Sequence, residues 1–262
     1  MNWLGHSAVP HYTFAASYLQ QQLGELKVRH LAQANGVPKE MKKYPPILIF
    51  GRPDVVQEVR LCTFADAAFP KIDGSVYEQT GILCGLVLGT GPEAAFHPLG
   101  WSSHKQNRVS RSSSAAEILS IVEAEELGLS LRIALEAISG RQIPHELKVD
   151  SRSLFDTITT QHETKDFRLR QAVTSLRERY EVGDISVLRW IAGKTSPADA
   201  LTKRGASTSF LLSTMCTTGK LSVDFACGMT SNDVRMPPTQ TLSQAKLESP
   251  TGLYTASTTR TW

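Results

Sequence analysis

The sequence lacks the cysteine patterns of a structural zinc site or of a small disulfide-stabilised domain. Its four cysteines, Cys62, Cys84, Cys216 and Cys227, are scattered over 262 residues, and no two of them form a CxxC pair. Closely spaced pairs are typical of zinc sites, and dense frameworks are typical of small secreted domains. We therefore expect free thiols in a reducing compartment, and a cytoplasmic or nuclear protein.

Long hydrophobic runs are also missing. The longest apolar run, residues 81–89, is far shorter than the roughly 20 residues that a helix needs to cross a bilayer. The N-terminus lacks a basic region followed by a hydrophobic one, so no signal peptide is expected. The sequence therefore predicts no membrane partner.

Neither sign of charge dominates. The chain has 28 Lys and Arg residues against 25 Asp and Glu residues, which gives a net charge of +3 and an isoelectric point near 8.7. This mildly basic balance fits a polyanionic partner without requiring one. The length suits one hydrophobic core with appended segments.

The first 58 residues are expected to be mainly helical. Residues 12–19 carry apolar side chains at helical spacing. A second candidate helix, residues 28–41, contains Gly36 and Pro38, and because an interior proline costs about 3 kcal/mol we expect two shorter pieces there. The apolar run over residues 47–50 is typical of a strand.

From residue 59 the pattern changes to that of a sheet. The predicted strands cover residues 60–69, 79–88, 97–103, 147–149 and 185–191. Helices are predicted from Ser114 to Gly140, over residues 151–160, near Asp166 and at Ser196. Short strands mixed with helices predict an α/β fold with a mixed sheet and helices packed on it.

One acid interrupts an otherwise apolar strand. Within residues 63–69 the only charged side chain is that of Asp66. An unpaired carboxylate is costly to desolvate, so such a residue usually lies at a cleft or beside a cation. We therefore take Asp66 as the first of four acids at one metal site, the others being Glu117, Asp150 and Asp199. The alternative is a turn-proximal acid at a strand end.

The other three acids have structural interpretations as well. Ser114-x-x-Glu117 and Ser196-x-x-Asp199 both have the spacing of an N-terminal capping box, in which side chains satisfy backbone donors of a helix. Asp150 could cap the helix that follows it. The spacing leaves these interpretations open.

Six short motifs occur in one order over residues 60–205. They are Phe64-Ala65-Asp66, Gln79-Thr80-Gly81, Trp101-Ser102-Ser103-His104-Lys105-Gln106, Ser112-Ser113-Ser114-Ala115-Ala116-Glu117, Val149-Asp150-Ser151 and Ala198-Asp199-Ala200-Leu201-Thr202-Lys203. Together they resemble the ribonuclease H domain of copia-type (Pseudoviridae-like) retrotransposon Pol polyproteins. The resemblance implies a ribonuclease H-like fold, a five-stranded mixed sheet flanked by helices.

The resemblance also divides the chain. Residues 1–58 are similar to the end of the reverse transcriptase that precedes this domain in such polyproteins, and residues 59–205 would be the ribonuclease H-like domain. Residues 206–224 are expected to be a helical extension, and residues 225–262, rich in Ser, Thr, Pro and Gln, a disordered tail. No adjacent Asp-Asp pair occurs in the chain, so the polymerase's metal-binding motif of that form is absent and no DNA synthesis is expected.

The activity that the resemblance implies is cleavage of the RNA strand of RNA-DNA hybrids by an endonuclease, leaving 5′-phosphate and 3′-hydroxyl ends. Two divalent ions can activate water, stabilise the leaving oxygen and balance charge at phosphorus. Mg2+ prefers oxygen ligands, and Mn2+ would be a substitute. The resemblance implies that Asp66 bridges both ions, that Glu117 and Asp150 bind one, and that Asp199 binds the other.

Basic residues near these acids in the sequence are candidates for phosphate contacts. They are Lys105, Arg108, Arg111, Lys203 and Arg204. Ordinary solvated surface charges are the alternative for each of them.

A histidine that helps product release is known in some ribonucleases H, and the family commonly has a Lys-His-Ile triplet on the helix after the third acid. Here Lys165 is followed by Asp166 and Phe167. The candidate for this role is therefore His162, the only histidine between the third and fourth acids.

A second functional class stays open at this point. The chain could be a retroelement fragment that acts as a non-catalytic nucleic-acid-binding or structural module. Its partners would be an RNA-DNA hybrid and the rest of a retroelement polyprotein. The presence of all four acids favours the enzyme.

Overall fold

The computed structural model describes residues 5, 7–43, 48–50, 58–69, 78–91, 93–110, 112–160, 164 and 166–222. The expected tail over residues 225–262 lies outside the described residues. So do two candidate site residues, Arg111 and His162. Of the cysteines, Cys62, Cys84 and Cys216 are buried free thiols, as predicted.

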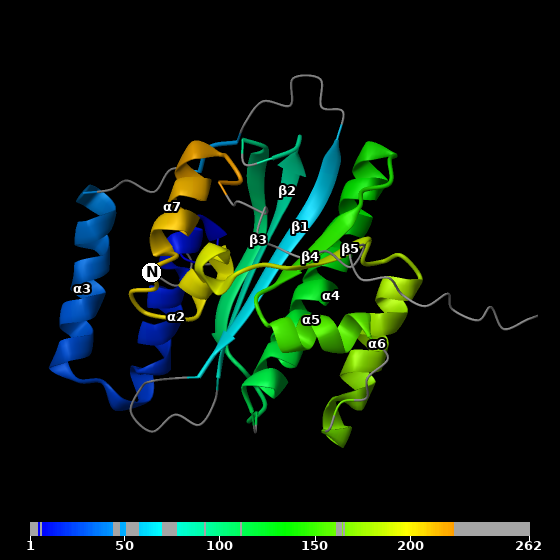
Figure 1. Ribbon diagram of the computed structural model, residues 1–262. Coiled ribbons are helices and arrows are strands. Elements are labelled where there is room, and N and C mark those ends of the chain that lie inside the picture. Colours follow the sequence, from blue (N-terminus) through cyan, green and yellow to red (C-terminus); the bar gives the residue numbers. More distant parts are fainter. Residues whose placement is uncertain are drawn as a thin grey trace, which may run out of the picture.

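A five-stranded mixed sheet forms the centre of the molecule (Figure 1). Its strands are β1 (Val59–Ala68), β2 (Gln79–Leu88), β3 (Ala95–Lys105), β4 (His145–Val149) and β5 (Val187–Trp190). They lie in the order β3-β2-β1-β4-β5, with β2 antiparallel to both β1 and β3, and β4 parallel to both β1 and β5. The predicted fold class, a mixed sheet flanked by helices, is confirmed.

Helices cover both faces of the sheet (Figure 1). One face carries α4 (Ser113–Ser139), α5 (Arg152–Thr159) and α6 (Arg170–Glu181), and the other carries α2 (Thr13–Gln21) and α7 (Ser209–Thr218), with α3 (Val28–Lys43) outermost. Short 3-10 helices complete the chain: η1 (Pro10–Tyr12), η2 (Leu23–Glu25), η3 (Phe167–Leu169), η4 (Gly193–Thr195) and η5 (Pro197–Leu201). None of the described helices is long and apolar enough to span a membrane.

The central strand β1 is apolar on both faces because it contributes to two cores. Side chains alternate along a strand, so neighbouring residues point to opposite faces. Ala65 belongs to the core beneath α4, α5 and α6, whereas Phe64 belongs to the core beneath η5 and α7 and packs against Phe96 with ring centroids 6.4 Å apart. A strand enclosed in this way leaves little room for a charge, except near its end.

The N-terminal helices are joined to the sheet by hydrogen bonds to buried polar groups. The amide of Gln79, at the start of β2, donates to the hydroxyl of Ser17 in α2 at 3.1 Å and to the hydroxyl of Ser103 in β3 at 2.9 Å. Gln21 donates to the Gln79 amide oxygen at 2.9 Å. In addition, the indole N–H of Trp101 donates to the Gly5 carbonyl at 2.7 Å. Segments far apart in the sequence are thereby held against β2 and β3.

Two expectations for the N-terminal region were wrong. Residues 28–41 do not form two pieces, because α3 continues through Pro38. The helix is at least partly exposed from Ala34 to Pro38, so water can reach the carbonyl of Ala34 that the proline leaves without a donor. Residues 48–50 form no strand. Instead the Ile49 N–H donates at 3.0 Å to the carbonyl of Cys216, one of the last carbonyls of α7, which lack partners within the helix.

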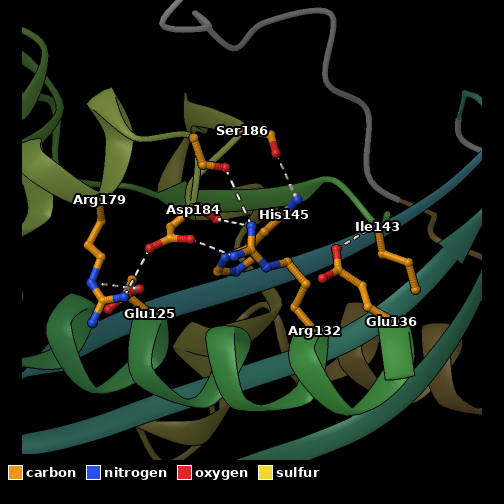
Figure 2. Close-up of polar contacts among 9 residues, drawn as sticks. Glu125, Arg132, Glu136, Ile143, His145, Arg179, Asp184 and Ser186 are labelled. Atoms are coloured by element: carbon orange, nitrogen blue, oxygen red, sulfur yellow. Dashed lines mark hydrogen bonds and ion pairs between the residues drawn. The ribbon is translucent and has the colours of Figure 1, made fainter. Parts of the chain in front are cut away.

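Four charged side chains of alternating sign meet where β4 begins (Figure 2). We call Glu125, Arg132, Arg179 and Asp184 the paired-charge network. Arg132 of α4 donates to the Asp184 carboxylate at 2.5 Å, and Arg179 of α6 donates to its other oxygen at 3.0 Å. The Arg179 guanidinium also lies 3.8 Å from Glu125. Burial opposes ionisation of Asp184, but the hydrogen bonds from both arginines outweigh it and lower the Asp184 pKa.

Candidate metal centre

The parallel pairing of β1 and β4 brings two of the predicted acids together. Ala65 is paired with Val149 in the register, so the next residues, Asp66 and Asp150, lie side by side at the same edge of the sheet. Asp150 directly follows the last residue of β4, where the chain leaves the sheet. Its backbone is fixed there because the Trp190 indole donates to the Asp150 carbonyl at 3.0 Å.

The first turns of α4 bring the third acid to the same edge. The Ser120 hydroxyl donates to the Asp66 carbonyl at 2.8 Å, which fixes the helix against β1. Glu117 precedes Ser120 by three residues, a spacing that places both on one face of a helix. Gln106 donates to the Ala116 carbonyl at 2.9 Å and to the Thr80 hydroxyl at 3.0 Å, so the start of α4 is also bound to β2.

Asp66, Glu117 and Asp150 form a cluster that we call the acid triad. One carboxylate oxygen from each lies within 4.8 Å of those of the other two. Oxygens on opposite sides of an octahedral Mg2+ are about 4.2 Å apart, so a small closure would let all three bind one ion. Asp66 is 2% exposed, and Asp150 Oδ1 is buried without a hydrogen-bond partner among the described residues. A buried oxygen without a partner fits a cation ligand.

The acid triad is electrostatically unfavourable without a cation. Burial raises the Glu117 pKa to about 8, and the neighbouring Asp150 and Asp66 contribute to this rise. Burial, followed by the charge of Asp66, raises the Asp150 pKa to about 7. The Asp66 pKa is also raised by burial, against the opposing effects of Lys203 and Thr202. Burial and mutual repulsion therefore favour the protonated forms of these acids, whereas a bound cation would favour the ionised forms.

The fourth predicted acid, Asp199, lies beside the triad rather than within it. It belongs to η5, and both of its carboxylate oxygens have protein partners. Lys203 forms a short ion pair with Oδ1, and the Thr208 hydroxyl donates to Oδ2 at 2.9 Å. Asp199 is still close enough for its charge to raise the pKa of Asp66 and of Asp150. Its role as a metal ligand stays a prediction.

The helix-capping alternatives are wrong for three acids. The N-cap of α4 is Ser112, whose hydroxyl accepts from the Ala115 N–H at 3.2 Å, so Ser114 and Glu117 form no capping box. The N-cap of α5 is Ser151, not Asp150. For Asp199, the partners described above take the place of the backbone donors of a capping box.

Two residues that sequence reasoning left without a role contribute to the geometry. The Thr202 hydroxyl donates a short hydrogen bond to the Asp66 carboxylate. Gly81 is paired with Asp66 across the β1–β2 ladder, and a Cβ at Gly81 would lie 2.7 to 2.8 Å from atoms of Thr202, Ala198 and Leu201. Only a glycine lets η5 pack this closely beside Asp66. Both residues lie within the motifs, but their contacts link segments more than a hundred residues apart.

The predicted phosphate-binding residues lie at different distances from the acid triad. Lys203 Nζ is 3.7 Å from Asp66 Oδ2, so this lysine belongs to the centre itself. Burial opposes its charge, but Asp66 and Asp199 outweigh that effect and raise the Lys203 pKa. Lys203 and Arg204 also line a cavity of about 470 Å3 together with Tyr12 and Tyr18. Lys105 ends β3, and Arg108 is exposed in the loop that follows.

Comparisons with known proteins concern the fold. No protein-family model matches the chain, and no curated protein matches it. Among solved structures, LC11-RNase H1 in complex with an RNA/DNA hybrid is 13% identical with a TM-score of 0.39, and the match covers 55% of this chain and 94% of that one. RNase H1 from the halophilic archaeon Halobacterium salinarum NRC-1 is 20% identical, with a TM-score of 0.37 and the same coverages of 55% and 94%.

A third similar structure is the N-terminal RNase H domain of a Mycobacterium tuberculosis protein. It is 13% identical with a TM-score of 0.37, and the match covers 59% of this chain and 99% of that one. The arrangement that the motifs predicted, a five-stranded mixed sheet flanked by helices, is present in this chain. Likenesses at this level concern the arrangement of the chain alone, and the acid triad is the basis for any function.

Proposed function

We propose that this chain is a metal-dependent endonuclease that hydrolyses the RNA strand of RNA-DNA hybrids. The observation that carries the proposal is the convergence of Asp66, Glu117 and Asp150 from β1, α4 and the end of β4. These elements are distant in the sequence, and each acid is held there by contacts of its own backbone or of its immediate neighbours. One buried and two half-buried carboxylates that share a single lysine are costly to a fold, so they are best explained by a bound ion.

The acid triad would hold Mg2+, with Mn2+ as a substitute. Two such ions, when bound, activate the attacking water, stabilise the leaving oxygen and balance charge on the phosphate. The chain's own contribution is orientation. Thr202 donates to one oxygen of Asp66 and so directs the carboxylate that we assign as the bridge between the ions. Glu117 and Asp150 cluster with Asp66 and would bind one ion, while Asp199, which lies outside this cluster, would bind the second.

The substrate would follow the basic residues beside the triad. Lys203 and Arg204 connect the centre to the cavity that they share with Tyr12 and Tyr18, in which positive charge and aromatic rings lie together. Positive charge suits phosphates, and aromatic faces suit bases. Lys105 and Arg108 would add further contacts with substrate phosphates. We therefore propose an RNA-DNA hybrid as the partner, with affinity that falls as salt rises.

The proposed biological setting is a copia-type retrotransposon Pol polyprotein. In that setting residues 1–58 would be the end of a reverse transcriptase, and the protein would work in the cytoplasm or the nucleus. The motif order supports this assignment. The hydrogen bonds from Gln79 to Ser17 and from Gln21 to Gln79 are compatible with it, since they join the N-terminal helices to the ribonuclease H-like part.

A second candidate function is a nucleic-acid-binding module with little turnover. The observation that favours it is the Lys203 ammonium, which occupies the space between Asp66 and Asp199. A lysine fixed there would oppose entry of the second ion. The fold and its basic residues would then bind a hybrid without cutting it.

One assay separates these functions. The protein is incubated with an end-labelled RNA-DNA hybrid and Mg2+, beside Asp150→Asn and a matched control, Asp156→Asn. Asp156 is a half-exposed acid of α5 that pairs with Arg152, away from the triad. We expect cleavage of the RNA strand by the parent and by Asp156→Asn, and none by Asp150→Asn. Retention of the hybrid without cleavage would support the binding module, and equal cleavage by all three proteins would refute the assigned site.

A further inference from the structure

The acids around Asp66 differ in their charge balance. Glu117 and Asp150 cluster with Asp66, and no described cation lies within ion-pair distance of either of them. Asp199 lies outside that cluster, and Lys203 Nζ contacts Asp199 Oδ1 and is 3.7 Å from Asp66 Oδ2. The proposed centre therefore has one half that lacks a cation and one half that already contains an ammonium group.

The two carboxylates beside the Lys203 ammonium are also held by hydrogen bonds from neutral side chains. Thr208 donates to Asp199 Oδ2 at 2.9 Å, and Thr202 donates to Asp66 Oδ2. Both carboxylates therefore keep a neutral partner if the lysine leaves. Lys203 lies four residues after Asp199, so the pair forms within one short segment. Its side chain is 49% exposed and carries a flexible four-carbon stem, so Nζ can move toward solvent.

We propose that Lys203 is the built-in cation of this second half of the centre. Without nucleic acid, the protein takes one divalent ion at the acid triad, and Lys203 keeps a second ion from the space between Asp66 and Asp199. A substrate phosphate offers the ammonium another anionic partner, which draws Lys203 away and opens that space. The second ion is thus admitted together with the hybrid. This inference rests on the proposed function and specifies the order in which its ions bind.

Charge arithmetic favours this order. An ammonium and a divalent ion repel each other, so they do not share two carboxylates at close range. At the acid triad Lys203 pairs with Asp66 alone, so a divalent ion can bind beside Glu117 and Asp150, which have no ion-pair partner among the described cations. A lysine that merely bound phosphate would need no contact with Asp66 or Asp199.

The test counts ions in the full-length protein without nucleic acid, by isothermal titration with Mn2+. We expect one ion in the parent and in Lys203→Arg, which keeps the charge. In Lys203→Met we expect two ions, with the affinity for the second raised by about tenfold or more, since a tenfold change needs only about 1.4 kcal/mol. Lys39→Met, at an exposed lysine of α3, is the matched control and should bind one ion.

Two ions in the parent, or one in folded Lys203→Met, would overturn the inference while leaving the nuclease proposal intact. No ion in the parent would instead refute the proposed function. Asp199→Asn gives a measurement that does not depend on Lys203→Met folding. Because Asp199 does not hold the first ion in this scheme, its loss should leave one ion bound, whereas loss of that ion would contradict the inference. A parent titration with a hybrid present should show the second ion, and its absence there would also count against it.

Discussion

The acids at the two ends of β4 differ in whether cationic side chains pair with them. Where the strand begins, the paired-charge network alternates acids and arginines, and Asp184 accepts from two guanidinium groups (Figure 2). Where the strand ends, the acid triad gathers three carboxylates, and among the described cations only Lys203 forms an ion pair with any of them. At the first end the two arginines favour the ionised form of Asp184. At the second end the fold disfavours the ionised forms of the three acids.

The contrast has an energetic meaning. Two like charges at about 4 Å repel by roughly 4 kcal/mol at an effective dielectric constant of 20. In the triad, burial and this repulsion raise the Glu117 and Asp150 pKa values, so the protonated forms of both acids are favoured. In the network the arginines offset the effect of burial on Asp184. Replacing Asp184 and replacing Glu117 by their neutral amides should therefore have opposite effects on stability.

The largest expected difference between variants at the two ends of β4 is in the rate of catalysis. Glu117→Gln should lower the rate of RNA-strand cleavage by about a thousandfold, equivalent to about 4 kcal/mol, because it removes a proposed metal ligand. Glu125→Gln, on the same helix in the paired-charge network, should stay within a fewfold of the parent. Cleavage rates under single-turnover conditions measure both. Comparable losses in the two variants would mean that the triad has no special role.

The next effect is on stability. Asp184→Asn should lower the free energy of unfolding by about 2 kcal/mol, because Arg132 and Arg179 lose a charged acceptor in a partly buried place. Glu117→Gln should raise it by about 1 kcal/mol in metal-free buffer near neutral pH, since the neutral amide is buried without taking up a proton. Urea denaturation with a chelator present measures both changes. If the two variants shift stability in the same direction, the contrast between the two ends is wrong.

The pH dependence of stability should also reflect the raised pKa values of the acid triad. The Glu117 pKa rises from 4.5 to about 8 on burial in the fold, so the folded protein binds this proton more tightly than the unfolded chain does. Metal-free stability should therefore be highest at low pH as far as this group is concerned, and this contribution should be lost as pH rises from about 4.5 through about 8. Asp150 acts in the same direction, up to about pH 7.

Thermal melts of the parent and Glu117→Gln across this pH range test that expectation. The decline in stability should be smaller in the variant, because its side chain does not titrate. Parallel curves for the two proteins would show that the Glu117 proton contributes nothing.

The smallest expected effect is stabilisation by metal. At a Mg2+ concentration ten times the dissociation constant, binding to the folded state adds about 1.4 kcal/mol. The melting temperature of the parent should rise accordingly, and Asp66→Asn should show less of this gain. Asp184→Asn should keep the full gain despite its lower starting stability. A melting curve that does not change through a Mg2+ titration would argue against the site.

The sequence predicted the sheet better than the details of the centre. Strand β2 covers residues 79–88 as expected, since an apolar strand between turn residues is a local pattern. Asp66 was expected to be costly in an apolar strand, and it is buried and adjacent to two other acids. The joint position of Asp66 and Asp150 depends on the register of two parallel strands, which no local pattern specifies.

Other features could not be predicted from the sequence because they also depend on packing between distant segments. The Lys203 ammonium between Asp66 and Asp199 depends on how η5 packs on β2, and that packing depends on the absence of a Cβ at Gly81. The spacing of Ser114 and Glu117 suggested a capping box, but the helix begins one residue earlier and Ser112 is the cap. Local propensity also misjudged Pro38, because exposure of the surrounding helix lets water replace the lost hydrogen bond.

The amide of Gln79 has a consequence for how such a chain could be divided. It bonds Ser17 of α2 and Ser103 of β3 at once, and it is 7% exposed. If a protease cut between residue 58 and the first strand, the Ser17 and Gln21 bonds would still join the two fragments. A nicked chain should therefore migrate as one particle in gel filtration. A gene shortened to start at residue 59 should yield an aggregation-prone protein, because the part of the sheet face that α2 covers would be exposed.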